Sequence, residues 1–170
     1  SDVYKRQGYS VTNCHSSVAI GSNAMSQYNL SCCTFVGYEA GKGAMQDNHV
    51  GLGYNALCNK KANVCTAIGY NCMGGDSPSS DHVGYNTGVG CNVLRVVQGS
   101  STNQGCYNTV MGHHAAYNLT TGYKNVIIGS HAANNNTHLN QSVVIGHSAG
   151  YNITNSTGNV IIGIQAGMSY

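Results

Sequence analysis

The chain has few charged residues. Asp, Glu, Lys and Arg together make up 7% of its 170 residues, whereas a typical soluble domain has about 25%. The formal net charge is only +2, and beyond the first dozen residues the only adjacent basic pair is Lys60 and Lys61. A nucleic-acid-binding protein presents a dense face of Lys and Arg to the phosphates. The composition therefore argues against nucleic acid as a partner.

Long hydrophobic runs and a recognisable targeting signal are also missing. No stretch approaches the roughly 18 continuous apolar residues of a membrane-spanning helix, so we expect no membrane insertion. No charged segment followed by an apolar one opens the chain. The opening "SDVYKRQ" resembles the translation of an adapter that often begins open reading frames in assembled environmental DNA. We therefore expect residues 1–12 to be a leader outside the native fold, and residues 13–170 to be one repeat domain from a longer protein.

Proline is nearly absent, with Pro78 as its single instance, while the chain contains 23 Gly and 21 Asn. Gly and Asn are typical turn residues. Because ionised side chains are so few, solubility must come from Asn, Ser, Thr and Tyr. This composition suits an elongated molecule with many turns.

The most regular feature is a repeat of nine short apolar segments that each end in Gly. Successive glycines are 16, 16, 16, 21, 22, 17, 17 and 17 residues apart. Helix-pair repeats are about 33 residues or longer, whereas one strand and one turn in 16 or 17 residues suits a β-solenoid with coils about 4.8 Å apart. The segments are "SVAIG" at Gly21, "TFVG" at Gly37, "VGLG" at Gly53, "TAIG" at Gly69, "TGVG" at Gly90, "TVMG" at Gly112, "VIIG" at Gly129, "VVIG" at Gly146 and "VIIG" at Gly163.

We therefore predict an all-β protein, a single-chain parallel β-solenoid or β-roll of about nine coils. The two long steps predict loop insertions near residues 74–85 and 94–106. The Gly is expected where the backbone needs positive φ or approaches another strand closely. Three residues after each Gly lies a column of mostly Ala, from Ala24 to Ala166, which we expect to face a narrow interior.

Side chains alternate between the two faces of a strand. We expect the residues one and three before each Gly to face the core, and the residue two before it to face outward. That middle position is never polar. An apolar stripe along the whole rod is a patch that monomers rarely expose, so we predict that it packs against identical stripes in a symmetric oligomer. The predicted interface residues are Phe35, Val110, Ile127, Val144 and Ile161.

Several of these phrases resemble known repeats. "SSVAIGSNA", "NVIIGSHAA" and "SVVIGHSAGYN" are similar to the head repeats of trimeric autotransporter adhesins (YadA-like heads), and "VGYEAGKG", "VGYNAL" and "NVIIGIQAG" are similar to repeats of bacteriophage tail-fibre proteins. The resemblance covers nearly all of the chain from about Ser16. It implies a left-handed roll, a homotrimer and a place on a virion tail fibre or a bacterial outer surface. The coils of 16 to 17 residues depart from the adhesin heads, which more often use about 14.

Eight cysteines lie in the first two thirds of the chain, and no two of them are one period apart. Stacked coils would place Cys33 and Cys65 about 9.6 Å apart, two strand spacings, which is beyond the reach of a disulfide. We therefore predict mostly reduced thiols, typical of assembly in a reducing cytoplasm. A virus fibre is assembled there, so the thiols favour the fibre over the adhesin.

We find no convincing catalytic constellation and predict no enzyme activity and no cofactor. Asp76 and Asp81 are the only near-neighbouring carboxylates, and turn formation beside Ser and Pro explains them better than a glycosidase pair. His114 and His131 share a column and are a weak candidate metal site, with an exposed polar row as the alternative.

Tyr38, Tyr54 and Tyr70 follow the Gly in three consecutive coils. Stacking along the rod is the simpler interpretation, and contact with sugar rings is the alternative. Together with Asp76 and Asp81, these tyrosines are the candidates for surface binding.

We expect a non-enzymatic structural and adhesive segment of a trimeric surface fibre, in contact with a glycan or protein receptor on a host or cell. Two alternatives stay open. A left-handed β-helix acyltransferase would need two further aliphatic hexads in each coil. An ice- or surface-binding solenoid would need a flat Thr array, and we expect the column of Thr34, Thr66, Thr87 and Thr109 to face inward.

Overall fold

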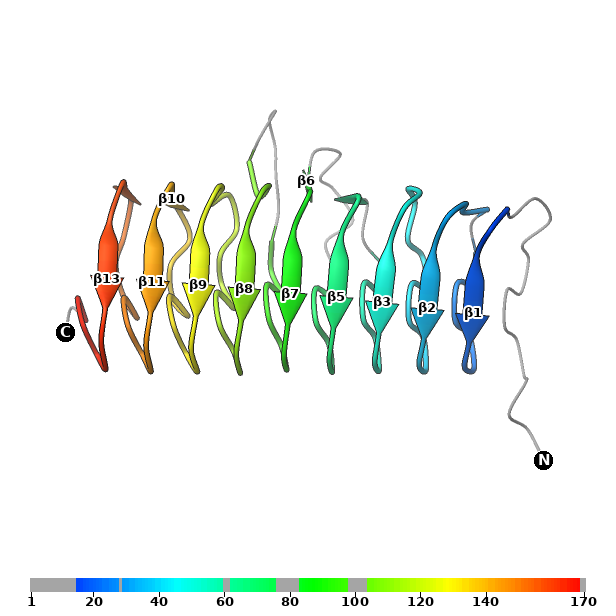
Figure 1. The fold of residues 1–170 in the computed structure, drawn as a ribbon, viewed down its shortest axis with the longest axis horizontal. Coiled ribbons are helices and arrows are strands. Elements are labelled where there is room, and N and C mark those ends of the chain that lie inside the picture. Colours follow the sequence, from blue (N-terminus) through cyan, green and yellow to red (C-terminus); the bar gives the residue numbers. More distant parts are fainter. Residues whose placement is uncertain (1–14, 28, 60–61, 76–82, 98–103, 169–170) are drawn as a thin grey trace.

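The computed structural model describes residues 15–27, 29–59, 62–75, 83–97 and 104–168, which form an all-β rod of stacked coils (Figure 1). Nine parallel three-residue strands form one sheet along its length, and no helix occurs in these ranges. The predicted β-solenoid is therefore confirmed. In sheet order the strands are β1 (Val18–Ile20), β2 (Thr34–Val36), β3 (Val50–Leu52), β5 (Thr66–Ile68), β7 (Thr87–Val89), β8 (Thr109–Met111), β9 (Val126–Ile128), β11 (Val143–Ile145) and β13 (Val160–Ile162).

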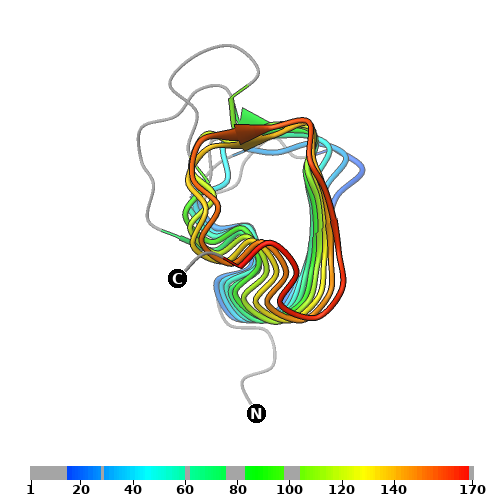
Figure 2. The ribbon, with the colours of Figure 1, turned by 90° about the vertical axis from the view of Figure 1, so that its left-hand side faces the viewer.

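Two short strand pairs lie outside this sheet. β4 (Ala62–Asn63) pairs with β6 (Val83–Gly84), and β10 (Leu139–Asn140) pairs with β12 (Ser156–Thr157), both in parallel. Viewed along the rod, the coils superpose closely (Figure 2). Each coil therefore repeats the path of the coil before it.

The strand register follows the spacing of the glycines. β2 pairs with β3 at a shift of one 16-residue period, Thr34 opposite Val50, and β7 pairs with β8 across the longest step, Thr87 opposite Thr109. The register is thus the same on both sides of each predicted insertion. Strand β6 falls within the expected loop at 74–85, and residues 76–82 and 98–103 lie outside the described ranges.

The glycine that ends each strand is required by both conformation and space. At Gly129 φ is +136°, a conformation that residues with a Cβ rarely adopt. A Cβ there would collide with the carbonyl of Gly146 in the next coil. The Ala column also lies where we predicted, since its members from Ala24 to Ala149 have no exposed surface.

The prediction of which strand face is buried was wrong. The middle residue of each strand points into the rod, and Phe35, Val110, Ile127 and Val144 are all 0% exposed. Ile161 in β13 is partly buried and packs against the same core. The two flanking residues of each strand point outward instead, as at Val126 and Ile128, which are 38% and 36% exposed.

Size compensation inside each coil explains this orientation. The middle strand residue meets the residue six positions later, four after the Gly, and the two are complementary in size. Where the middle strand residue has a large side chain, its partner has a small one, and where the middle residue is small, its partner is large. The nine pairs are Ala19 with Met25, Phe35 with Gly41, Gly51 with Leu57, Ala67 with Met73, Gly88 with Leu94, Val110 with Ala116, Ile127 with Ala133, Val144 with Gly150, and Ile161 with Gly167.

Contacts confirm that these pairs share the same space. A Cβ at Gly41 would lie against the ring of Phe35, and a Cβ at Gly150 would lie 3.3 Å from Cγ1 of Val144. Because the two side chains of a pair share one space between the strand and the turn that follows it, that space accepts one large residue per coil. A column that contains Phe, Val, Ala and Gly can therefore face the core.

A column of polar side chains is also buried, and sequence analysis did not find it. We call it the buried polar ladder, at the position four residues before each Gly. Side chains in one coil accept hydrogen bonds from the backbone N–H at the same position in the next coil, as from Cys65 to Nδ1 of His49 at 3.1 Å and from Asn108 to Oδ1 of Asn86 at 2.8 Å. Its members are Ser17, Cys33, His49, Cys65, Asn86, Asn108, Asn125, Ser142 and Asn159.

The cysteines in the described part of the chain form no disulfide with one another. Cys72 occupies the Ala column at 0% exposure, where burial raises its pKa to about 12. Cys33 and Cys65 belong to the buried polar ladder. These thiols therefore pack as small buried side chains.

The size compensation predicts a rescue. Ile127→Ala should lower the free energy of unfolding by about 2–5 kcal/mol, because it leaves a cavity in a layer that cannot collapse. Ala133→Leu in the same chain should recover part of this loss, since Leu57 and Leu94 occupy the same position and backbone conformation in other coils. Urea unfolding of the wild type and of the single and double variants measures both effects. A double variant less stable than Ile127→Ala would contradict the pairing.

Candidate functional site

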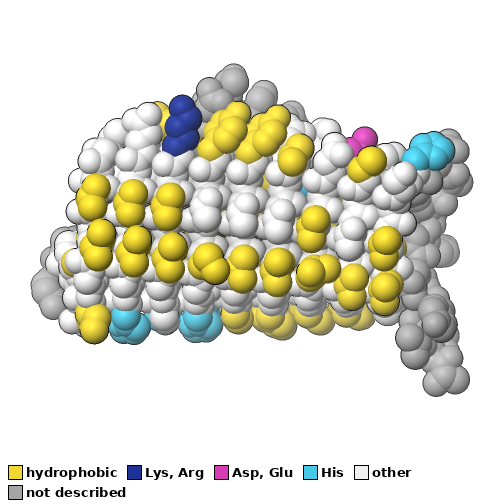
Figure 3. Space-filling model, in the orientation of Figure 1, with side chains coloured by type: hydrophobic (Ala, Val, Ile, Leu, Met, Phe, Trp, Pro, Cys, Tyr) yellow, Lys and Arg dark blue, Asp and Glu magenta, His cyan; other side chains and the backbone are white. Residues whose placement is uncertain are grey.

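The outward side of the nine-stranded sheet carries exposed apolar side chains along the whole length of the rod. We call it the outer sheet face, and it consists of the first and third residues of each strand. The third residues form an unbroken hydrophobic row along the rod, and the first residues form a second row interrupted by threonines (Figure 3). Exposed members include Ile20 at 49% and Met111 at 42%. With eight steps of about 4.8 Å, the face is about 40 Å long.

This face replaces the predicted interface. Phe35, Val110, Ile127 and Val144 cannot contact a partner, because they are fully buried in their own chain. The uncovered stripe consists instead of the two columns of flanking strand residues. These columns are Val18, Thr34, Val50, Thr66, Thr87, Thr109, Val126, Val143 and Val160, and Ile20, Val36, Leu52, Ile68, Val89, Met111, Ile128, Ile145 and Ile162.

A row of stacked tyrosines borders the outer sheet face. The ring centroids of Tyr38 and Tyr54 lie 5.2 Å apart, those of Tyr54 and Tyr70 lie 5.1 Å apart, and the rings are nearly parallel. The predicted stacking is confirmed. All three side chains are exposed, and the charge of Glu39 is the main cause of a raised pKa at Tyr38.

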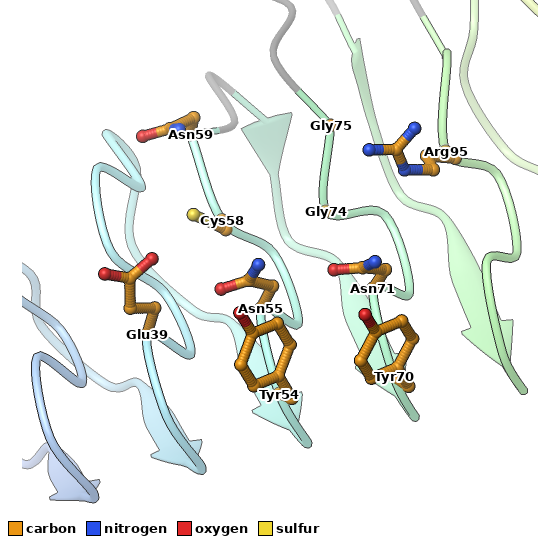
Figure 4. A pocket seen from close by; sticks show the side chains of 10 residues that line it. All are labelled: Glu39, Tyr54, Asn55, Cys58, Asn59, Tyr70, Asn71, Gly74, Gly75 and Arg95. Atoms are coloured by element: carbon orange, nitrogen blue, oxygen red, sulfur yellow. The ribbon is translucent and has the colours of Figure 1, made fainter.

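A cavity of about 220 Å³ adjoins this tyrosine stack. Tyr54 and Tyr70 line one side of it, and Asn55 and Asn71 project from the next position of the same two coils (Figure 4). The Asn side chains belong to a column two residues after each Gly, where φ is near +50°, a conformation that Asn tolerates better than most residues. Sequence analysis named Tyr54 and Tyr70 as candidates for surface binding but missed the other lining residues, although the sequence shows the Asn column. The full lining is Glu39, Tyr54, Asn55, Cys58, Asn59, Tyr70, Asn71, Gly74, Gly75 and Arg95.

Charged groups lie at opposite ends of this cavity. The carboxylate of Glu39 accepts a hydrogen bond from Nζ of Lys42 at 2.7 Å, and this ion pair raises the pKa of Lys42. At the other end, Nη1 of Arg95 donates to the hydroxyl of Tyr117 at 3.1 Å. Between them, Oδ1 of Asn55 is buried and has no hydrogen-bond partner among the described residues.

Four histidines gather farther along the same edge of the rod. The ring centroids of His114 and His131 are 5.4 Å apart, close to the distance expected from one coil step, and His113 lies 5.3 Å from His131. His147 lies 6.4 Å from His131. Within the described ranges, no group of three or more His, Cys, Asp or Glu side chains is arranged to hold a metal ion.

The clustering affects the titration of these rings. The pKa of His114 is lowered by desolvation first and then by the charges of His113 and His131. The pKa of His131 is lowered by desolvation and by His113 and His147. His49 in the core also has a lowered pKa, because burial disfavours its charged form.

The remaining predicted site residues, Asp76 and Asp81, lie outside the described part of the chain. Comparison with protein-family models, curated proteins and solved structures gives no match to this chain. Among the described residues, no helix is long and apolar enough to cross a membrane.

The lowered histidine pKa values predict that acid destabilises the fold. In the folded state these rings bind protons less readily than in the unfolded chain, whose histidines titrate near pH 6.5. The free energy of unfolding should therefore hold above about pH 6.5 and fall as the pH decreases below it. Urea unfolding at a series of pH values above and below about 6.5 measures how steeply the free energy of unfolding changes with pH. The double variant His114→Gln, His131→Gln should reduce this slope, and equal slopes in the wild type and this variant would contradict the assignment.

Proposed function

We propose that this chain is a non-enzymatic structural and adhesive segment of a trimeric fibre, either a bacteriophage tail fibre or a bacterial adhesin head on the cell surface. The observation that carries the proposal is the outer sheet face. An apolar surface about 40 Å long is unusual on a monomer and typical of an interaction site.

Association would place the exposed aliphatic side chains in contact with each other. Ile20, Met111 and Ile162 are 49%, 42% and 63% exposed, and removing such side chains from water is favourable by about 25 cal/mol per Å². The face is built of backbone-paired strands, so it is rigid before association and little ordering entropy is lost.

The number of subunits and the fibre context rest on the resemblance of the repeats to adhesin heads and tail fibres. A closed ring of three rods, each offering the same face, is one of the cyclic arrangements that homo-oligomers adopt. The sparse charge fits this proposal, since no dense like charge opposes close packing of identical rods.

A charged substitution on the outer sheet face should dissociate the oligomer. We expect the wild type to sediment at three times the 17.7 kDa chain mass. We expect Ile128→Glu to sediment as a single chain, because three carboxylates would be buried together. Gln141→Glu is the matched control, with the same new charge at an exposed position outside the outer sheet face, and it should stay trimeric. A monomeric wild type at micromolar concentration would contradict the proposal.

A second candidate is an ice- or surface-binding role for the same face. The prediction that the Thr column faces inward was wrong, since Thr87 and Thr109 are exposed, although Val50 still interrupts the column between Thr34 and Thr66. Thr66, Thr87 and Thr109 occupy adjacent strands in register. This gives a short regular Thr row on a flat sheet, flanked by aliphatic side chains.

The two functions differ in their response to ice. An ice-binding face should produce a gap between the melting and freezing points of the solution, and Thr87→Lys should abolish that gap because the long side chain projects from the flat row. Ile164→Lys, outside the outer sheet face, is the control. If the wild type shows neither a freezing gap nor inhibition of ice recrystallisation, the ice-binding candidate fails and the fibre proposal is unaffected.

A further inference from the structure

We infer that the cavity beside the tyrosine stack is a saccharide-binding site that takes one pyranose ring of a longer glycan. The inference gives the proposed adhesive role a ligand class and rests on that role for its biological meaning. The binding chemistry itself depends only on the residues of the cavity.

The stack of three rings ends at Tyr70, which also lines the cavity. The parallel rings of Tyr38, Tyr54 and Tyr70 cover the faces between them. The next position in the column is Cys91, whose side chain is too small to continue the stack. The outer face of Tyr70 is therefore uncovered, in agreement with its 51% exposure against 43% for Tyr54. The apolar C–H face of a pyranose can pack on such a ring.

Polar groups around the cavity match the hydroxyls of a sugar. The amides of Asn55 and Asn71 each offer donors and an acceptor, and Oδ1 of Asn55 has no partner within the described structure. Oδ1 is buried in this conformation, so a sugar hydroxyl would reach it only after rotation of the amide. The guanidinium of Arg95, held by the hydroxyl of Tyr117, supplies fixed donors at the far end.

The size and shape of the cavity favour one sugar ring over a larger enclosed ligand. Its volume of about 220 Å³ is below the roughly 300–1,000 Å³ of pockets that enclose drug-sized molecules. Its lining residues come from four successive coils, those of β2, β3, β5 and β7. A glycan could thus continue along the rod on either side of the bound ring.

The charges make the site compatible with both neutral and acidic sugars. Glu39 is neutralised by Lys42 at one end, so it does not repel an anionic ligand strongly. Arg95 at the other end could pair with the carboxylate of an acidic sugar. Neutral and acidic sugars both offer a pyranose ring with an apolar face and adjacent hydroxyls. Neutral and sialylated probes therefore distinguish the two classes of ligand.

Saturation-transfer NMR and titration calorimetry with lactose, triacetylchitotriose and 3′-sialyllactose test the inference on the full chain. We expect at least one of the three to bind. Tyr70→Ala should weaken that binding about tenfold, the effect of one lost aromatic contact, and Asn55→Leu should weaken it as well. Tyr70→Trp should retain it, because an aromatic face at this position is kept.

Tyr107→Ala is the matched control. Tyr107 stacks on Tyr85 at a centroid distance of 5.0 Å and is 45% exposed, but it does not line the cavity. This variant should bind the sugar as the wild type does. Absence of binding to all three saccharides, or equal binding by wild type, Tyr70→Ala and Asn55→Leu, would overturn the inference.

Failure of saccharide binding can be distinguished from failure of the fibre proposal. Tyr70 lies outside the outer sheet face, so Tyr70→Ala should leave the sedimentation mass unchanged. If Ile128→Glu yields a monomer that still binds the saccharide, the site functions without assembly. If the wild type is a monomer yet binds the saccharide, the fibre proposal fails and the binding site stands.

Discussion

The in-register stacking of parallel strands is the constraint on which the rest of this structure depends. Each strand lies about 4.8 Å from the next, and every position in a coil therefore lies against the same position in its neighbours. At the strand-ending Gly the next coil leaves no room for a side chain, since a Cβ at Gly37 would collide with the carbonyl of Gly53. The residue type at each position must therefore fit the same position in the adjacent coils as well as its neighbours in its own coil.

This constraint explains the unusual composition. A column of like charges at strand spacing would repel at every step, whereas Asn side chains can hydrogen-bond along a column. The exposed row of Asn118, Asn135 and Asn152 does so at 3.1 and 3.0 Å. The buried polar ladder uses the same device inside the rod. The low charge and the many Asn residues are consequences of the register.

Sequence spacing was enough to predict the fold class, the strand positions, the pairing register and the buried Ala column. It did not predict which strand face is buried, because alternation allows two solutions and hydrophobicity favoured the wrong one. Columns such as Ile20 to Ile162 are more uniformly aliphatic than the true core column, which contains Gly51 and Gly88. The decisive signal was the inverse size relation between residues six apart, as in Phe35 with Gly41. This size relation connects two columns, so the residue types of either column alone do not show it.

The candidate site was only partly predictable for a related reason. The tyrosine stack follows from the register, but the cavity forms between columns and requires the position of Arg95, which follows a strand in a coil with an insertion. The two surfaces also differ in character. The outer sheet face is flat, apolar and repeated in all nine strands, which suits contact with identical copies. The cavity is polar and confined to coils where Tyr, Asn and Arg coincide. Because it lies at the border of the sheet, packing of the outer sheet faces would leave the tyrosine edge at the rim of the assembly, where a long glycan could reach it.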